Sequence, residues 1–354
     1  MNIANLTRAA AVLLAAAAPT SFAQTLPPGT LPVEQMAVYQ GADRHEKLLA
    51  AAKAEGGELS VYHVYAALSR VIAEFSKKYG IKVSPWRSGS ETVLQRLMNE
   101  ARGNRFEADV MQNNAPEAEF ACREKLLMEV RSPHHAKLVP QAVPAHRCWV
   151  GFAVDLFIVA YNTIKVSKEE LPKSYQELLD PKWKGRLGIE ADDHGWFGTL
   201  SGMLGEQQTH QLFGRIVATN GLSLRRGHSL LANLVASGEI PLALAAYSWT
   251  LEQLKQKGAP IEVHLIDPMI AQFSSVGVSR KAKNPYTALL FYDWLLDEGQ
   301  KLLHDLKFVP TSRAHQSPVL KLNIRYIDPG EALQNHDKWL KDYERIVVKR
   351  RAAS

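Results

Sequence analysis

The chain has 354 residues, and 46% of them are hydrophobic, including seven tryptophans, so it can build the core of one large domain or two ordinary ones. This composition excludes an intrinsically disordered chain. The formal net charge is +6, but the basic residues are scattered until residues 349–351, which argues against nucleic acid as a partner and is compatible with small anionic ligands.

The first 23 residues have the pattern of a secretory signal peptide. Arg8 precedes the apolar run 9–18, and the triplet 21–23, Ser-Phe-Ala, supplies small residues at a cleavage position. The run is too short for a permanent membrane span, and no later stretch approaches about 18 uninterrupted apolar residues. The sequence therefore predicts that segment 1–23 is removed and that the mature protein is a soluble protein of the periplasm.

The two cysteines of the chain are Cys122 and Cys148, both in the predicted mature part. An even number of cysteines in an oxidising compartment favours a disulfide bond. This bond would close a loop of roughly 27 residues and stabilise the fold by about 3 kcal/mol. Two free, buried thiols are the alternative.

The first region has the pattern of an alternating α/β fold. Residues 24–44 are interpreted as an N-terminal tether without a core-forming pattern, and the tether leads into a helix that runs to about residue 55. The following predicted elements are a strand over 58–63, a helix over 66–79, a strand over 81–84, a helix over 91–102 and a strand over 108–111. This order is a βαβαβ unit, which implies a parallel sheet with right-handed crossovers.

A second α/β region follows two extended segments, around 149–150 and 156–161. Its predicted strands and helices alternate, at 175–179 (helix), 187–190 (strand), 195–205 and 207–219 (helices), 222–224 (strand), 228–237 (helix), 241–247 (strand) and 248–257 (helix). An extended stretch over 261–280 and helices at 285–296, 298–305 and 330–347 complete the chain. The sequence therefore predicts two α/β lobes with more than one chain crossing between them.

Several motifs resemble those of the periplasmic solute-binding proteins of ABC importers, in the branch that includes the ferric-ion-binding proteins. The most specific is Asp-Pro-Lys-Trp-Lys-Gly-Arg at 180–186, directly after a short helix. Other similar segments are 58–62, 74–83, 97–100, 108–110, 238–244 and 254–260. The similarity extends from about residue 45 to 315. It implies a type II periplasmic-binding-protein fold with a ligand cleft between two lobes.

The resemblance also implies a domain layout and a role. The expected layout is lobe 1 at 45–150 and 278–320, lobe 2 at 160–265, hinge crossovers at 149–161 and 265–277, and a C-terminal helix and tail at 321–354. The expected role is to capture a solute by lobe closure and to deliver it to an ABC permease in the inner membrane. We expect a monomer with no cofactor.

Candidate ligand-binding residues follow the predicted strands. In open α/β sheets the ligand lies beyond the carboxyl ends of the strands, where helix N-termini present free N–H groups. The residues at these positions are Tyr62, His63, Tyr65, Ser88, Gly89, Ser90, Asn113, Asn114, Asp193, Trp196, Phe197, Tyr247, Ser248 and Trp249.

The sequence departs from the ferric-binding pattern at the residues that matter for iron. The resemblance implies an acidic residue after the third strand, where this chain has Asn113 and Asn114. It also implies adjacent tyrosines in the second lobe, where this chain offers Tyr247 and has Trp249 in place of a second tyrosine. Neutral amides do not replace the anionic oxygen ligands that suit a hard, highly charged cation.

We therefore expect a small organic solute, stacked on Trp249 or Tyr65. A negatively charged solute suits the helix start at 88–90 and the basic balance of the chain. The alternative is ferric iron, with Tyr247, His63 and Tyr65 as its ligands.

The patterns that would indicate catalysis are weak. The segment 227–231 lacks the closing glycine of a nucleophile elbow, and no Walker loop or G-x-G-x-x-G motif is present. Three consecutive residues, 192–194 (Asp-Asp-His), do not by themselves make a tetrahedral metal site. We expect no enzymatic activity; a periplasmic hydrolase and a sensory binding protein are the lesser alternatives.

Overall fold

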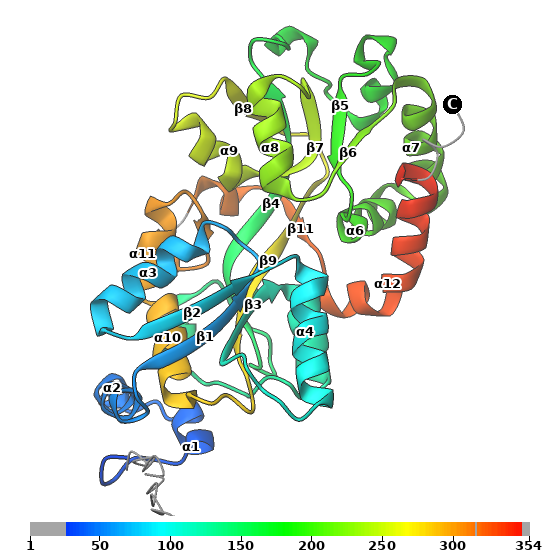
Figure 1. Ribbon diagram of the computed structural model, residues 1–354. Coiled ribbons are helices and arrows are strands. Elements are labelled where there is room, and N and C mark those ends of the chain that lie inside the picture. The colour runs from blue at the N-terminus through cyan, green and yellow to red at the C-terminus, as the bar shows by residue number, and fades with distance from the viewer. Residues whose placement is uncertain (1–25, 316, 349–354) are drawn as a thin grey trace, which may run out of the picture.

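The computed structural model describes residues 26–315 and 317–348, and the predicted signal peptide lies outside them. The chain forms two α/β lobes connected by long strands, which confirms the predicted two-lobe α/β fold (Figure 1). In the described part of the chain, every helix is too short or too polar to cross a bilayer.

The first lobe, at the bottom of Figure 1, contains both terminal and internal segments. Its elements are α1 (Val33–Val38), α2 (Arg44–Ala54), β1 (Glu58–His63), α3 (Leu68–Tyr79), β2 (Lys82–Arg87), α4 (Ser90–Arg102), β3 (Val110–Asn114), α5 (Ala115–Arg123), α10 (Pro285–Leu296) and α11 (Glu298–Asp305). The second lobe, at the top, is built from β5 (Leu187–Glu190), α6 (His194–Leu204), α7 (Glu206–Asn220), β6 (Ser223–Arg225), α8 (His228–Ser237), β7 (Leu242–Tyr247), α9 (Ser248–Lys255) and β8 (Ile261–His264).

Two long strands run between the lobes, and two short strands near the C-terminus pair with them (Figure 1). The connecting elements are β4 (Val150–Asn162), β9 (Met269–Val278), β10 (Val309–Pro310), β11 (Ile324–Tyr326) and α12 (Pro329–Tyr343). The domain boundaries drawn from the sequence stay a prediction.

One sheet extends through both lobes in the order β2-β1-β3-β9-β4-β7-β5-β6. Strand β1 is parallel to β2 and β3, which confirms the pairing expected of the βαβαβ unit. Strands β5, β6 and β7 are likewise parallel to one another. The connecting strands β4 and β9 are antiparallel to each other and to their neighbours β7 and β3.

The strand β4 is continuous, whereas the sequence predicts two separate extended segments. All 13 of its residues are buried. The prediction breaks the strand around Asp155, because a carboxylate interrupts the apolar pattern of a buried strand. In the structure Asp155 is fully buried and accepts hydrogen bonds from two side chains, which satisfy the charged group in the middle of the strand.

The predicted tether contains a helix. Within 24–44 the structure has α1, in which Met36 and Ala37 are buried. The guanidinium of Arg44 donates hydrogen bonds to the carbonyl oxygens of Met36 and Tyr39 and forms a buried ion pair with Asp293, at 2.6 Å. The sequence pattern misses this segment because the helix is only six residues long and depends on a distant partner, Asp293, that no local pattern reveals.

The C-terminal helix α12 contacts both lobes. It packs against α6 of the second lobe and α5 of the first (Figure 1). The ring of Trp339 lies over Gly198 of α6, and the hydroxyl of Tyr343 donates a hydrogen bond to the carbonyl oxygen of Glu190. Up to residue 348, the C-terminal segment therefore packs against both lobes.

The structure joins Cys122 and Cys148 in a disulfide bond, with Cα atoms 5.7 Å apart. Cys122 lies in α5, and Cys148 directly precedes Trp149 and strand β4. The bond therefore connects a helix of the first lobe to the start of a connecting strand.

We predict that Gly198→Ala destabilises the docked C-terminal helix. A Cβ at this position would lie 2.1 Å from a ring carbon of Trp339, so the ring or the helix must shift. Overpacking of this kind costs about 1–3 kcal/mol in the free energy of unfolding, which urea denaturation measures. The matched control is Gly202→Ala, one turn further along α6, where an added Cβ meets no atom within 4 Å. Equal stabilities of the two variants would show that Trp339 does not anchor α12.

Candidate functional site

The strand ends of the two lobes meet near the middle of the connecting strands. Asn114, at the end of β3, is paired with Ser274 of β9, and Tyr247, at the end of β7, is paired with Phe157 of β4. Because β1 and β2 are parallel to β3, and β5 and β6 to β7, the carboxyl ends of all six strands face the same region. The helices that follow these strands therefore begin between the lobes.

Buried polar atoms without a hydrogen-bond partner are concentrated at these helix starts. Among the residues that the structure describes, seven such atoms belong to the caps and first turns of α5, α6, α8 and α9. They are Asn114 Oδ1, Glu117 Oε2, Asp193 Oδ2, His194 Nδ1, His228 Nδ1, Ser248 Oγ and Thr250 Oγ1. Buried polar atoms in folded proteins are nearly always hydrogen-bonded, so this concentration is typical of a site where another molecule supplies the partners.

The carboxylate of Asp155 lies at the centre of this region. It accepts hydrogen bonds from the hydroxyl of Tyr65, which follows β1 of the first lobe, and from the indole N–H of Trp249, at 2.9 Å, in α9 of the second lobe. Burial raises the pKa of Asp155 to about 6, although the two hydrogen bonds oppose this shift. One carboxyl group of a connecting strand thus contacts side chains from both lobes.

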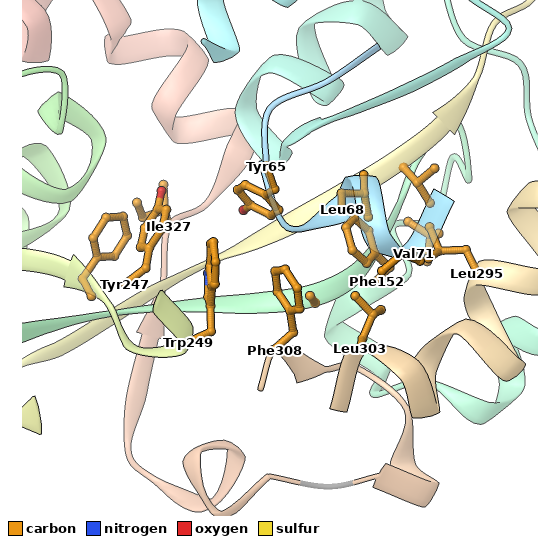
Figure 2. Close-up of a cluster of buried hydrophobic side chains, with 14 of the residues drawn as sticks. Tyr65, Leu68, Val71, Phe152, Tyr247, Trp249, Leu295, Leu303, Phe308 and Ile327 are labelled. Carbon is orange, nitrogen blue, oxygen red and sulfur yellow. The ribbon is translucent and has the colours of Figure 1, made fainter. Parts of the chain in front are cut away.

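Aromatic rings cover the same position. Figure 2 shows Tyr65, Trp249 and Phe308 side by side, with Tyr247 and Ile327 next to them. The ring of Trp249 stacks on Phe308, with centroids 4.6 Å apart, and lies 5.4 Å from the ring of Tyr65. Trp249 of the second lobe therefore packs against Tyr65 and Phe308, which are distant in the sequence and come from the side of the first lobe.

A cluster of two carboxylates and one imidazole lies in the second lobe. The potential ligand atoms of Glu190, Asp193 and His228 are all within 4.8 Å of one another. Burial would lower the pKa of His228, but attraction to Asp193, whose Oδ1 lies 3.2 Å from Nε2, outweighs it and raises this pKa to about 8. The imidazole ring of His228 stacks on the phenol ring of Tyr247, with centroids 3.6 Å apart.

Two carboxyl groups of the region, those of Glu190 and Glu117, have pKa values well above the usual value for glutamate. Burial and repulsion from Asp193 raise the pKa of Glu190 to about 7, although the N–H of Gly227 donates a hydrogen bond to it, at 2.8 Å. Burial also raises the pKa of Glu117, in the first turn of α5, to about 7, and a hydrogen bond from Ser90 only partly opposes this. A bound molecule that offers hydrogen-bond donors or positive charge would stabilise the ionised form of these carboxyl groups.

The structure brings many of the sequence-predicted residues together. Tyr65, Tyr247 and Trp249 lie in the aromatic cluster, and Asn114, Asp193 and Ser248 carry unpartnered polar atoms. The turn over 88–90 begins α4 beside this region, with Gly89 as the N-cap, and Asn113 donates a hydrogen bond to the carbonyl oxygen of Ser90. The side chain of His63 is buried, with Nδ1 3.0 Å from the carbonyl oxygen of Tyr65.

Three predicted residues point elsewhere, and one of them, Phe197, packs against the rings of Phe213 and Tyr343. Tyr62 lies on the other face of β1, where its hydroxyl donates to Glu100, at 2.5 Å, and Arg96 covers its ring. Trp196 packs in the core of the second lobe, with its ring 6.1 Å from Tyr175. Strand alternation sets the face of Tyr62, since neighbouring residues point to opposite sides of a sheet.

Sequence reasoning missed several residues of the region, among them Asp155, Glu117, Glu190 and His228. A single acidic residue inside an apolar strand, Asp155, was the one available signal, because a buried charge needs a partner. Glu117 and His228 look like ordinary first-turn residues of a helix, and Glu190 looks like the polar end of a strand.

We predict that Asp193→Asn lowers the pKa of His228 from about 8, because burial is then opposed only by the more weakly acting carboxyl groups of Glu190 and Asp155. NMR titration of the His228 imidazole measures this. The same shift predicts a pH dependence: the stability that protonated His228 contributes is complete below about pH 6.5 and is lost as the pH rises through about 8. Asp192→Asn is the control. An unchanged pKa in Asp193→Asn would contradict the pairing.

The sequence matches the family model described as bacterial extracellular solute-binding protein over residues 70–318. Among curated relatives, the Fe(3+)-binding periplasmic protein of Serratia marcescens is 27% identical, over 65% of this chain and 70% of the relative. Iron uptake protein A1 of Synechocystis is 26% identical, over 69% of this chain and 72% of the relative.

Solved structures show the same fold. Iron-bound HitA from Pseudomonas aeruginosa superposes with a TM-score of 0.72 at 23% identity, covering 82% of this chain and 99% of HitA. The periplasmic binding protein AfuA from Actinobacillus pleuropneumoniae, with fructose-6-phosphate bound, gives a TM-score of 0.72 at 22% identity, with 82% and 98% coverage. The fold is thus that of type II periplasmic binding proteins, and since the family model spans most of both lobes, the chain belongs to the bacterial extracellular solute-binding proteins.

Proposed function

We propose that this protein is the periplasmic solute-binding component of an ABC importer and captures a small organic solute between its lobes. The observation that carries the proposal is the set of unpartnered polar atoms at helix starts of both lobes. A solute that bonds to both sets stabilises the closed form through its higher affinity for that form. The closed protein then delivers the solute to a membrane permease. This is a binding cycle without a chemical step.

The unpartnered atoms also favour a class of solute. Three of them, on Asn114, Glu117 and Asp193, are oxygen atoms that accept hydrogen bonds, so the solute offers N–H or O–H donors. Ser248 and Thr250 add hydroxyl groups at the start of α9. Helix N-termini favour negative charge. We therefore infer a solute that carries an anionic group together with amino or hydroxyl groups.

Ferric iron is the second candidate, and a specific observation favours it. Glu190, Asp193 and His228 lie within 4.8 Å of one another, and the phenols of Tyr65 and Tyr247 are buried in the same region. Carboxylate and phenolate oxygens suit a hard cation. The names of two relatives refer to iron. Against iron, the hydroxyls of Tyr65 and Tyr247 already bond to Asp155 and Gln272.

We predict that an anionic solute with amino or hydroxyl groups raises the melting temperature of the exported chain. A thermal-shift panel compares ferric iron with organic carboxylates, phosphates and phosphonates, each with and without such groups. A ligand at about 100 times its Kd adds roughly 2.7 kcal/mol to the free energy of unfolding, which gives a measurable shift. Glu117→Gln and Asp193→Asn should reduce the shift.

The control for these variants is Glu124→Gln, because Glu124 is exposed at the other end of α5 and should leave the shift unchanged. A shift with ferric iron alone would refute the organic solute and favour the second candidate. An organic ligand whose shift persists in both cleft variants would refute the assigned site.

A further inference from the structure

Three potential metal ligands meet beside the helix starts of the two lobes, each from a different part of the fold. Glu91 lies in the first turn of α4, His194 in the first turn of α6, and His336 in the C-terminal helix α12. Their ligand atoms all lie within 4.8 Å of one another. Nε2 of His336 is 3.9 Å from a carboxylate oxygen of Glu91, and the two imidazole rings are 5.0 Å apart.

The donor set is the one that zinc prefers. Two imidazoles and one carboxylate leave a fourth tetrahedral position for water. Tetrahedral coordination at about 2.1 Å brings donor atoms to about 3.4 Å from one another, so small rotations of Glu91 and His336 complete the geometry. Both side chains have the freedom to rotate, since they are 62% and 41% exposed.

Two further features of the histidines favour the binding of a cation. Nδ1 of His194 is buried and has no hydrogen-bond partner in the described structure. Nδ1 of His336 lies 3.2 Å from the carboxylate of Asp337, which orients the ring and directs Nε2 toward Glu91. A carboxylate on the second nitrogen of a histidine is the usual outer partner of a metal ligand.

We propose that Glu91, His194 and His336 bind a divalent cation of the zinc type and thereby hold the two lobes and the C-terminal helix together. Opening of the lobes would separate Glu91 from His194, because they belong to different lobes. The ion therefore favours the closed form, and two of its three ligands, Glu91 and His336, lie outside the set of residues assigned to the solute.

A second cluster provides a comparison: Glu206 and His210 of α7 lie beside Asp342 of the C-terminal helix. Its carboxylates already pair with Lys338, at 2.6 and 3.2 Å, and Asp342 also pairs with Arg345, at 2.7 Å. These cations oppose the binding of a metal ion, so this cluster should not bind zinc with comparable affinity.

We predict that zinc chloride titrated into the exported chain without solute binds with one-to-one stoichiometry in calorimetry and reduces the radius of gyration in small-angle scattering. Glu91→Gln and His336→Gln should each raise the Kd at least about tenfold, since the loss of even an outer-shell partner costs 10- to 100-fold. His210→Gln should leave the Kd unchanged.

The melting temperature of each variant without zinc shows whether it is folded, and His336→Gln should keep the wild-type value because the side chain is 41% exposed. The absence of zinc binding by the wild-type chain would overturn the proposal. So would zinc binding that survives both His194→Gln and His336→Gln, or that is lost in His228→Gln alone, which would locate the ion in the second-lobe cluster.

Discussion

The buried carboxylate of Asp155 receives one hydrogen bond from each lobe, from Tyr65 and from Trp249. A carboxyl group removed from water needs such partners, because an unbonded charge in a protein interior costs several kcal/mol. Strand β4, which carries Asp155, belongs to both lobes and is buried along its whole length. Asp155 therefore lies in the buried connecting strand and, at the same time, at the point where side chains of the two lobes meet.

The chemistry of the cleft follows from the same arrangement. Because the strand ends converge on the middle of β4 and β9, helix starts from both lobes bring carboxyl groups into a region with little water. Burial raises the pKa values of Glu117 and Glu190, whereas the ion pair with Asp193 keeps His228 charged. A bound solute with donors and a negative charge would satisfy both kinds of group, and closure would complete the contacts.

The sequence predicts the elements that have a clear period and the residues that follow strands. Trp249 and Tyr65 are candidates for this reason, and the alternating pattern of 58–63 predicts β1 correctly. Their hydrogen bonds to Asp155 are not predictable from the sequence, because the partners lie 90 and 94 residues apart in the chain and no local pattern connects them. The sequence also does not show which face of the sheet a strand residue occupies. Tyr62 and His63 are adjacent, and only the structure shows that Tyr62 faces α4.

The radius of gyration of Asp155→Asn, measured by small-angle scattering against the wild type, tests the role of this carboxylate most directly. The amide of the variant can still accept a hydrogen bond from Tyr65, but its NH2 group has no lone pair for the indole of Trp249. We predict a larger radius of gyration for the variant, since Trp249 loses the hydrogen bond to Asp155 that helps to hold it against Tyr65 of the first lobe. Identical radii and identical melting temperatures would contradict the central role of Asp155.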